Sequence, residues 1–485
     1  LIGAMKNVNR RASQRTIKLS QSLIIQTTFA AFVISFIYIW FHIVRSVHQN
    51  GGRNGSQSNT YSLQKQRQNV RNESKAKATV AYAWTLAKCE DFQSSTVGMI
   101  DAALVLQYSV HQISSRVGKS EYDYQMYVFV HESAEKCAQV FREVGYTVLV
   151  FPQPIKARDI RGSYLRKNVD SEWCCGSKEF IKLYAYTLLQ HPIVVHVDID
   201  FAFFKPMDEL FDAMLYNNRL SEVRTQYPVR HWPANIEAFI TRDYPQLIPG
   251  DDRSLFQAGF MVVKPNKKVF DEIIAIILEG NFAEGWNSTS GWGGLGYSGK
   301  VGAKAMQGLI AYYYDSFQNN SSVELNGCHY NWMGGDVFYR NVPRFYPSQY
   351  PNLVGKCRNG KDHCEDCQKT PFTEIGSIHY TNCRKPWNCI GTRWIKGQPR
   401  GSLGIDERNT NFSACMIAIN QWHQLRKDLE DEVIKQTTNK NLKNKWRGGD
   451  YMRDTFLGHC KENGPSGYIS LNNFVPPHEF RKIYE

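Results

Sequence analysis

Beyond its first 78 residues the chain carries almost no net charge. The formal net charge of the whole sequence is +13, of which residues 1–22 supply +5 and residues 45–78 supply +6, so that +2 is left for residues 79–485. Domains that bind nucleic acid are usually strongly basic along one face. The near-neutral composition of residues 79–485 therefore argues against a nucleic-acid partner.

A second absence marks residues 23–44, a segment of 22 residues without Lys, Arg, Asp or Glu. A helix rises ~1.5 Å per residue, so this segment is long enough to cross a bilayer core of ~30 Å. The basic residues 1–22 precede it and favour a cytoplasmic N-terminus. The sequence predicts a cytoplasmic tail over residues 1–22 and a transmembrane signal anchor over residues 23–44, in a single-pass type II protein of the Golgi or another secretory-pathway membrane.

A cleaved signal peptide is the alternative, although its apolar region normally spans ~7–15 residues. The sequence opens on Leu1, and Met5 is a candidate first residue.

Residues 45–78 hold almost no large aliphatic side chains and show no periodicity, which indicates a flexible stem. All 12 cysteines follow this stem, and an oxidising lumen permits them to form disulfides. Cys364 and Cys367 form a C-x-x-C pair, which leaves zinc binding as the alternative. Sequons for N-glycosylation fit the lumenal side; they begin at Asn54, Asn72, Asn287, Asn319, Asn320 and Asn411.

Strand-like and helix-like segments alternate from residue 79 onwards. Strand-like runs cover residues 79–84, 124–130, 146–151 and 193–197, and helical patterns cover residues 99–113 and 178–189. This alternation predicts an α/β fold with a mostly parallel central sheet, in which ligands bind at the carboxyl ends of the strands. We predict one domain over residues 79–399 and an extension over residues 400–485, to which the sequence assigns no chemistry.

Two acidic residues, Asp198 and Asp200, directly follow the apolar run 193–197. Such a run is typical of a buried central strand, and residues i and i+2 of an extended chain point the same way. Both carboxylates then face one hard cation such as Mg²⁺ or Mn²⁺, which neutralises a diphosphate and stabilises its departure. A solvated surface turn is the alternative for an isolated Asp-x-Asp. His196, within the run, is more typical of a hydrogen-bonded core histidine than of a ligand.

Four blocks of sequence occur in an order that identifies a family. They are "FIKLYAYTLLQHPIVVHVDIDFAFFKPMDELFD", "FQAGFMVVKPN" (256–266), "MQGLIAYYY" (306–314) and "HYTNCRKPWN" (379–388). Together they resemble the glycogenin-like family 8 glycosyltransferases, and the similarity spans residues 79–395. The resemblance implies a GT-A type, Rossmann-like nucleotide-sugar-binding fold over residues 79–399. It also implies a UDP-sugar donor, Mn²⁺ or another divalent cation such as Mg²⁺, and transfer with retention of anomeric configuration to a hydroxyl of a glycan, glycoprotein or other acceptor.

The resemblance also assigns roles to individual residues. It makes Asp198, Asp200 and His379 the metal ligands. Gln307 lies beside the reacting centre and is the catalytic candidate. The donor-binding residues that it implies are Lys182, Asp198, Gln257, Asn382 and Lys385, with Lys385 on the pyrophosphate and Gln257 near the donor sugar.

Three positions depart from the family pattern. Met306 stands where many members have Asp, Phe201 replaces a Thr or Ser, and Asn382 replaces a Gly next to the phosphate. None of these changes removes an implied metal ligand. The alternative function is a catalytically inactive, membrane-anchored lumenal binding or scaffold protein with the same fold. An inverting transferase is a further alternative, but the sequence offers no general base for it.

Overall fold

We describe the fold from a computed structural model of the chain. It describes residues 76–89, 94–172, 175–217, 233–243, 254–333, 367–381, 383, 385–388 and 412–438, all within one unit, Ala76–Glu485. No helix among these residues is long and apolar enough to cross a membrane. The predicted tail and anchor and Asn382 lie outside the described residues.

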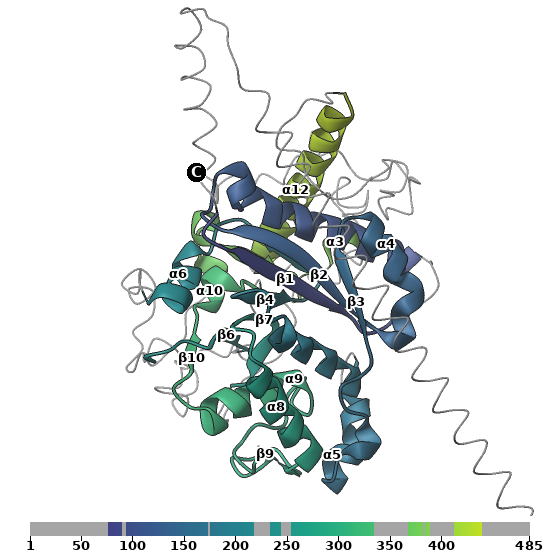
Figure 1. The fold of residues 1–485 in the computed structure, drawn as a ribbon, viewed down its shortest axis with the longest axis vertical. Helices are drawn as coiled ribbons and strands as arrows, with labels where there is room; N and C mark the ends of the chain where they lie inside the picture. The colour runs from purple at the N-terminus through teal and green to yellow at the C-terminus, as the bar shows by residue number, and fades with distance from the viewer. Residues whose placement is uncertain are drawn as a thin grey trace, which may run out of the picture. The chain divides into compact units, whose positions relative to one another are not determined.

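A seven-stranded sheet forms the centre of the fold, in the order β10-β6-β7-β4-β1-β2-β3 (Figure 1). Every neighbouring pair is parallel except the two pairs that include β7. The predicted α/β architecture with a mostly parallel sheet is therefore confirmed. The strands are β1 (Thr79–Leu86), β2 (Asp123–His131), β3 (Thr147–Phe151), β4 (Val194–Val197), β6 (Ala238–Arg242), β7 (Phe256–Val263) and β10 (Ser322–Glu324).

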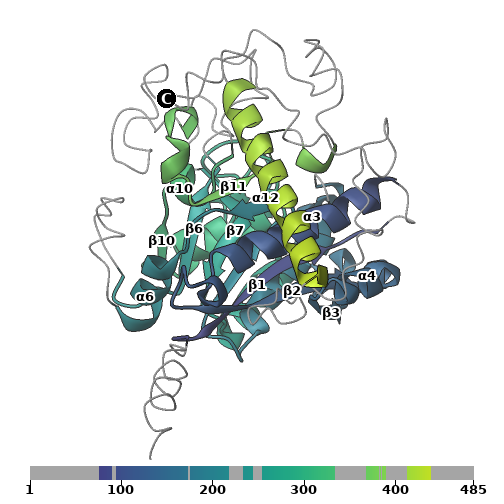
Figure 2. The ribbon, with the colours of Figure 1, turned by 90° about the horizontal axis from the view of Figure 1, so that it is seen from above.

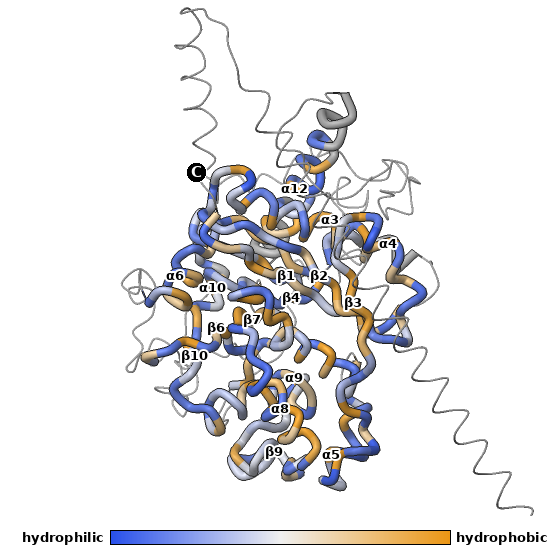
Figure 3. Tube along the Cα trace, viewed as in Figure 1, coloured by the Kyte–Doolittle hydropathy of each residue, from blue (hydrophilic) through white to orange (hydrophobic). Residues whose placement is uncertain are grey.

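Helices cover both faces of this sheet and bury a separate apolar core on each face. Along β1, Tyr82 and Trp84 enter one core and Ala81 and Ala83 enter the other, because successive side chains of a strand point to opposite faces. Figure 3 shows the apolar character of β3 and β7. The first core is covered by α3 (Ser94–Gln112), α4 (Ala138–Glu143) and α6 (Asp208–Tyr216), and the second by α5 (Ser163–Asn168), α8 (Lys267–Glu279) and α9 (Met306–Tyr312).

Two small sheets and a third apolar cluster complete the fold. β5 (Phe201–Phe203) pairs with β11 (Ser377–His379), and β8 (Phe282–Ala283) pairs with β9 (Gly291–Trp292). Helix α12 (Phe412–Thr438) lies across α3 (Figure 2). It buries Trp422 in a cluster with Ile378 and Tyr380. The chain also forms the short helix α10 (Gly327–Tyr330) and a π-helical turn at Tyr313–Phe317. Short 3₁₀ turns occur at Ser115–Val117, Glu132–Cys137, Ala157–Asp159, Val169–Ser171, Cys367–Lys369, Phe372–Glu374 and Pro386–Asn388.

The helix predicted over residues 178–189 is a 3₁₀ helix, η5 (Gly176–Thr187). A 3₁₀ helix has three residues per turn, so residues i and i+3 lie on the same side. Glu179 and Lys182 are such a pair, and their carboxylate oxygen and ammonium nitrogen are 3.3 Å apart. This winding aims Lys182 at the carboxyl end of β4, where it contacts Asp198.

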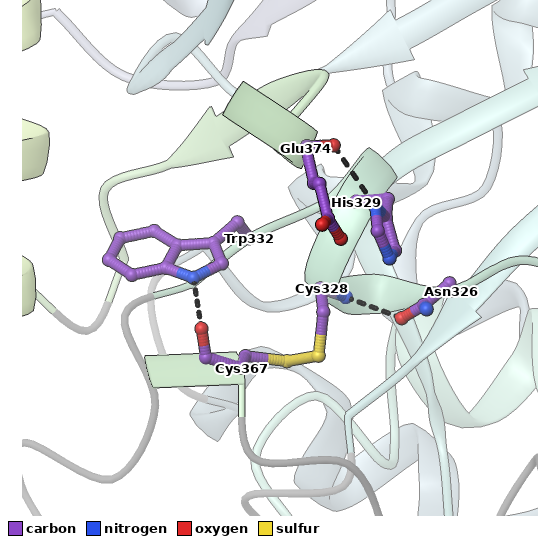
Figure 4. The surroundings of a disulfide bond; sticks show 6 residues. All are labelled: Asn326, Cys328, His329, Trp332, Cys367 and Glu374. Carbon is purple, nitrogen blue, oxygen red and sulfur yellow. Dashed lines mark hydrogen bonds between the residues drawn. A yellow bond between two sulfur atoms is a disulfide. The ribbon is translucent and has the colours of Figure 1, made fainter. Parts of the chain in front are cut away.

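Disulfides join distant parts of the described chain. Cys89 bonds to Cys137, and Cys328 bonds to Cys367 (Figure 4). Because its sulfur is committed to Cys328, Cys367 is not available as a zinc ligand, and the disulfide interpretation is confirmed for this cysteine.

His196 is a buried core residue, as its place in the apolar run predicts. Its Nε2 lies 2.9 Å from the Thr85 hydroxyl, and its ring stacks on Phe129 with a centroid distance of 6.0 Å. Burial, aided by the positive charge of Lys182, lowers the pKa of His196 to about 3. The imidazole is therefore neutral in the folded protein at physiological pH.

This neutral imidazole makes stability depend on pH. The folded-state pKa lies below the ordinary value of 6.5, so between these two pH values the unfolded chain binds one more proton and the free energy of unfolding falls as the pH falls. We expect the wild-type protein to lose about 2 kcal/mol more than His196→Gln between pH 6.5 and pH 5. Urea unfolding at the two pH values measures the difference, and an equal loss in both proteins would contradict this prediction.

Candidate functional site

The two aspartates lie where the chain passes from the central sheet to the small β5–β11 sheet. Strand β4 ends at Val197, the chain bends over residues 198–200, and β5 begins at Phe201. The sequence predicts that Asp198 and Asp200 lie in one extended segment. This prediction is wrong, because a bend ends the strand before Asp200. The carboxylates converge all the same.

Pairing between β5 and β11 brings a distant histidine to this bend. His379 is opposite Phe201 in the antiparallel register, and the next backbone N–H, that of Tyr380, donates to the Asp200 carbonyl at 2.8 Å. Ligand atoms of Asp198, Asp200 and His379 all lie within 4.8 Å of one another. The structure therefore brings together the three residues that the sequence assigns to one metal ion.

The geometry and donor types of this cluster fit a divalent cation. His379 Nε2 lies 3.5 Å from Asp200 Oδ1 and 3.8 Å from Asp198 Oδ2. The His379 and Asp200 side chains are buried, whereas that of Asp198 is 35% exposed, so the cluster is open on the Asp198 side. Two carboxylate oxygens and one imidazole nitrogen are ligands that Mn²⁺ and related divalent ions accept.

Two lysines hold the carboxylates in their ionised form. Lys385 forms an ion pair with Asp200, and Lys182 Nζ lies 2.8 Å from Asp198 Oδ1. Burial opposes the ionisation of both aspartates, but the lysines and His379 outweigh it, and the pKa of each carboxyl group lies below its ordinary value. Both carboxylates are therefore ionised at neutral pH, and each is partly balanced by a lysine.

Gly259 on β7 leaves the space that this cluster occupies. A Cβ atom built at Gly259 would lie 2.4 Å from His379 Cε1 and 2.7 Å from Asp198 Oδ2. The Gly259 carbonyl also accepts a hydrogen bond from the Asp198 N–H at 3.0 Å. The backbone of β7 thus forms one wall of the cluster of Asp198, Asp200 and His379, and a side chain at this position does not fit.

Gln257 and Gln307, to which the resemblance assigns places near the donor sugar and beside the reacting centre, meet at a third residue, Asp243. The side-chain amides of Gln257 and Gln307 both donate to Asp243 Oδ2, at 3.4 and 3.5 Å. All three side chains are buried. Asp243 was not predicted from the sequence. It follows β6, whose residues Ala238–Ile240 are apolar, but Thr241 and Arg242 separate them from the acid, so the signal is weaker than at β4.

The amide of Gln307 is held in one orientation from two sides. Its Nε2 donates to the Val301 carbonyl at 2.7 Å as well as to Asp243. Gly302, at φ 78°, packs so closely on the Gln307 side chain that a Cβ there would lie 2.7 Å from Gln307 Cγ. Because both amide hydrogens have acceptors, the Oε1 atom is the group that Gln307 offers to a ligand.

Two of the departures from the family pattern are core residues. Met306 is fully buried in the apolar core between the sheet and α9. Phe201 is also fully buried, and its ring stacks on Phe260 with a centroid distance of 5.6 Å. Each therefore contributes packing, and neither offers a polar group to a ligand.

Comparisons with known proteins complete the description. No family model and no curated protein matches the chain. Among solved structures it is similar to mouse xyloside xylosyltransferase 1 in its apo form, with a TM-score of 0.35 and 10% identity over 62% of this chain and 98% of that one. It is similar to the galactosyltransferase LgtC in complex with donor and acceptor sugar analogues, with a TM-score of 0.35 and 11% identity over 72% and 95%. The glycosyltransferase GlyE of Streptococcus pneumoniae TIGR4 gives a TM-score of 0.35 and 11% identity over 74% and 65%. At these values the functional assignment rests on the site itself.

Proposed function

We propose that this protein is a metal-dependent glycosyltransferase that moves a sugar from a UDP-sugar to a hydroxyl group of a glycan or glycoprotein, with retention of configuration. The observation that carries the proposal is the convergence of Asp198, Asp200 and His379 at the carboxyl edge of a mostly parallel sheet. Two lysines pair with its carboxylates, and Gln257, which donates to Asp243, lies with Asp198 and His379 around Gly259. A diphosphate needs cationic groups and a sugar needs fixed polar groups, and both sets are present.

The phosphate end of the donor is assigned to the metal cluster and its lysines. Mn²⁺ held by Asp198, Asp200 and His379 would offset the negative charge that grows on the departing diphosphate. Lys385 is partly exposed next to Asp200, so its ammonium group is placed to add a point charge on the leaving UDP. Lys182 is buried and binds Asp198, so its role is to orient that carboxylate.

The sugar end of the donor is assigned to Gln307, Gln257 and Asp243. As the bond to the diphosphate lengthens, the anomeric carbon becomes positively charged, and the oriented Oε1 of Gln307 stabilises it electrostatically. Asp243, 3.5 Å from Gln307 Nε2, adds negative charge to the same region. A carboxamide is a poor nucleophile, which favours a short-lived ion pair and attack by the acceptor from the same face.

The cellular setting of this reaction is part of the proposal. We assign the anchor to residues 23–44 and the catalytic part to the lumen of the Golgi or another secretory compartment. The disulfides Cys89–Cys137 and Cys328–Cys367 support an oxidising compartment, because disulfides rarely persist in the cytosol. Met306 favours the alternative function, a binding or scaffold protein without turnover. It lies in the apolar core, at a position where many members of the resembled family have Asp.

Donor turnover separates the enzyme from the scaffold. The detergent-solubilised full-length chain is incubated with a panel of UDP- and GDP-sugars and Mn²⁺, and released nucleotide is measured. We expect turnover of a UDP-sugar that EDTA abolishes and added Mn²⁺ restores, with retention in the product by NMR once an acceptor is supplied. Binding of donors without turnover of any of them would establish the scaffold alternative, and turnover unaffected by EDTA would contradict the metal site.

A further inference from the structure

The strand that carries His379 is only three residues long and depends on its neighbours for its position. β11 pairs with β5 on one side and with residues 327–332, which we call the clasp, on the other. Three backbone N–H groups form this second contact. Gly376 donates to the His329 carbonyl at 2.7 Å, Trp332 donates to that of Ser377 at 3.2 Å, and His379 donates to that of Trp332 at 2.8 Å.

The clasp is itself attached to the central sheet. Asn331 Nδ2 donates to the Thr241 hydroxyl on β6 at 2.8 Å, and the Tyr330 hydroxyl donates to Glu209 of α6 at 2.6 Å. The clasp is therefore hydrogen-bonded both to the central sheet, where Asp198 follows β4, and to the strand that contains His379. It fixes the position of that strand relative to the sheet.

A disulfide ties the clasp to the segment that leads into β11. Cys328 in the clasp bonds to Cys367, and the Trp332 indole N–H donates to the Cys367 carbonyl at 2.7 Å (Figure 4). His329 Nδ1 lies 3.0 Å from the Glu374 carbonyl, on the path from Cys367 to β11. The two cysteines are 39 residues apart, and the bond removes the entropy cost of closing that length of chain around the clasp.

Apart from the approach of Nε2 to Asp200 and Asp198, few side-chain contacts in the described part of the chain orient the imidazole of His379. Its Nδ1 is buried and has no hydrogen-bond partner among the described residues, whereas a metal-binding histidine usually donates this N–H to a carboxylate or carbonyl group. The position of the ring therefore follows from the backbone of β11 and from contact with Phe201, whose ring centroid is 5.6 Å away.

We propose that the Cys328–Cys367 disulfide is a positioning pair for the metal site: it holds the clasp and β11 in register, so that His379 Nε2 faces the two aspartates. The inference rests on the proposed metal site. In this protein the disulfide between the clasp and Cys367 takes the place of the hydrogen bond that normally orients a metal-binding histidine.

The test compares two disulfides in the full-length protein. Mn²⁺ binding is measured from the electron paramagnetic resonance signal of the free ion, for wild type, C328S/C367S and C89S/C137S, with thermal melts for each. The second disulfide is the matched control, because it also closes a long segment, of 48 residues, but it joins the segment after β1 to the 3₁₀ turn Glu132–Cys137 and includes no residue of β5, β11 or the clasp. We expect C328S/C367S to bind Mn²⁺ about tenfold more weakly. In its kinetics the Mn²⁺ concentration at half-maximal rate rises, while kcat at saturating Mn²⁺ stays close to that of wild type. C89S/C137S lowers the melting temperature without changing Mn²⁺ affinity.

Trp332→Phe keeps both cysteines and removes only the N–H that binds Cys367, so it tests the inference even if C328S/C367S does not fold. It should weaken Mn²⁺ binding in the same direction by a smaller factor. Wild-type Mn²⁺ affinity in Trp332→Phe and in any folded C328S/C367S would overturn the positioning role, and so would equal weakening by both disulfide variants. A wild-type protein that binds no Mn²⁺ would overturn the proposed metal site itself, which makes the two failures distinguishable.

Discussion

Asp200→Asn is expected to reduce sugar transfer by about 10²–10³-fold or more while the protein stays folded. The substitution keeps the size of the side chain but removes a charged ligand of the cluster that Asp200 forms with Asp198 and His379. It also removes the carboxylate that pairs with Lys385, so the lysine remains available to the diphosphate and nucleotide affinity is less affected than Mn²⁺ affinity. Steady-state kinetics over a range of Mn²⁺ concentrations measure both quantities.

Asp212→Asn is the matched control. Asp212 is also a buried aspartate in an ion pair, with Lys77, and it accepts a hydrogen bond from the Tyr122 hydroxyl at 2.5 Å. It lies in α6 and is not one of the proposed metal ligands. Its substitution should lower the melting temperature and leave the rate per folded molecule almost unchanged. Near-wild-type transfer by Asp200→Asn at saturating Mn²⁺ would show that the proposed mechanism is wrong.

Gly259→Ala is expected to disrupt the metal site without changing any ligand. The new methyl group would lie 2.4 Å from His379 Cε1 and 2.7 Å from Asp198 Oδ2. Strand β7 is hydrogen-bonded on both sides in the sheet, so its backbone has little freedom to move away, and the two ligands separate instead. We expect Mn²⁺ affinity and transfer each to fall by about 10²-fold.

Gly118→Ala provides the comparison, because a Cβ at Gly118 meets no atom within 4 Å and this glycine lies in the turn before β2, outside the clasp and the proposed metal site. It should bind Mn²⁺ as the wild type does. Isothermal titration with Mn²⁺ and circular dichroism of both variants separate a local effect at the site from unfolding. Unchanged Mn²⁺ affinity in Gly259→Ala would mean that the ion, if it binds, does not lie between Asp198 and His379.

The parts of the site that follow local rules could be predicted from the sequence. An apolar run that ends in acidic residues identified the carboxyl end of β4 and the pair Asp198 and Asp200. The apolar run depends on residues close together in the chain, where periodicity and side-chain type determine the local conformation. His379 and Lys385 came instead from the resemblance of residues 379–388 to a family motif.

The parts that depend on contacts between distant segments could not be predicted in the same way. The pairing of β5 with β11, the clasp and the partnership of Asp243 with two glutamines all join segments far apart in the chain, and no local pattern specifies their register. The 3₁₀ winding of η5 was also missed, because a short amphipathic segment gives similar patterns for the two helix types. The membrane anchor over residues 23–44 and the role of Asn382 remain predictions.

Helix α12 belongs to the same folded unit as the candidate site, because it packs against the residues that follow β11. The Tyr380 hydroxyl donates to the Ala418 carbonyl at 2.9 Å, and Tyr380 is the residue that follows His379, a proposed metal ligand. Trp422 of α12 is buried in the third apolar cluster, close to Trp387, with a ring centroid distance of 6.5 Å. A truncation at residue 399 would remove α12, which packs against the residues that follow β11. The side chains of Tyr380 and Trp387 would then be exposed to water. A fragment designed to keep the site intact should therefore include α12 (Phe412–Thr438).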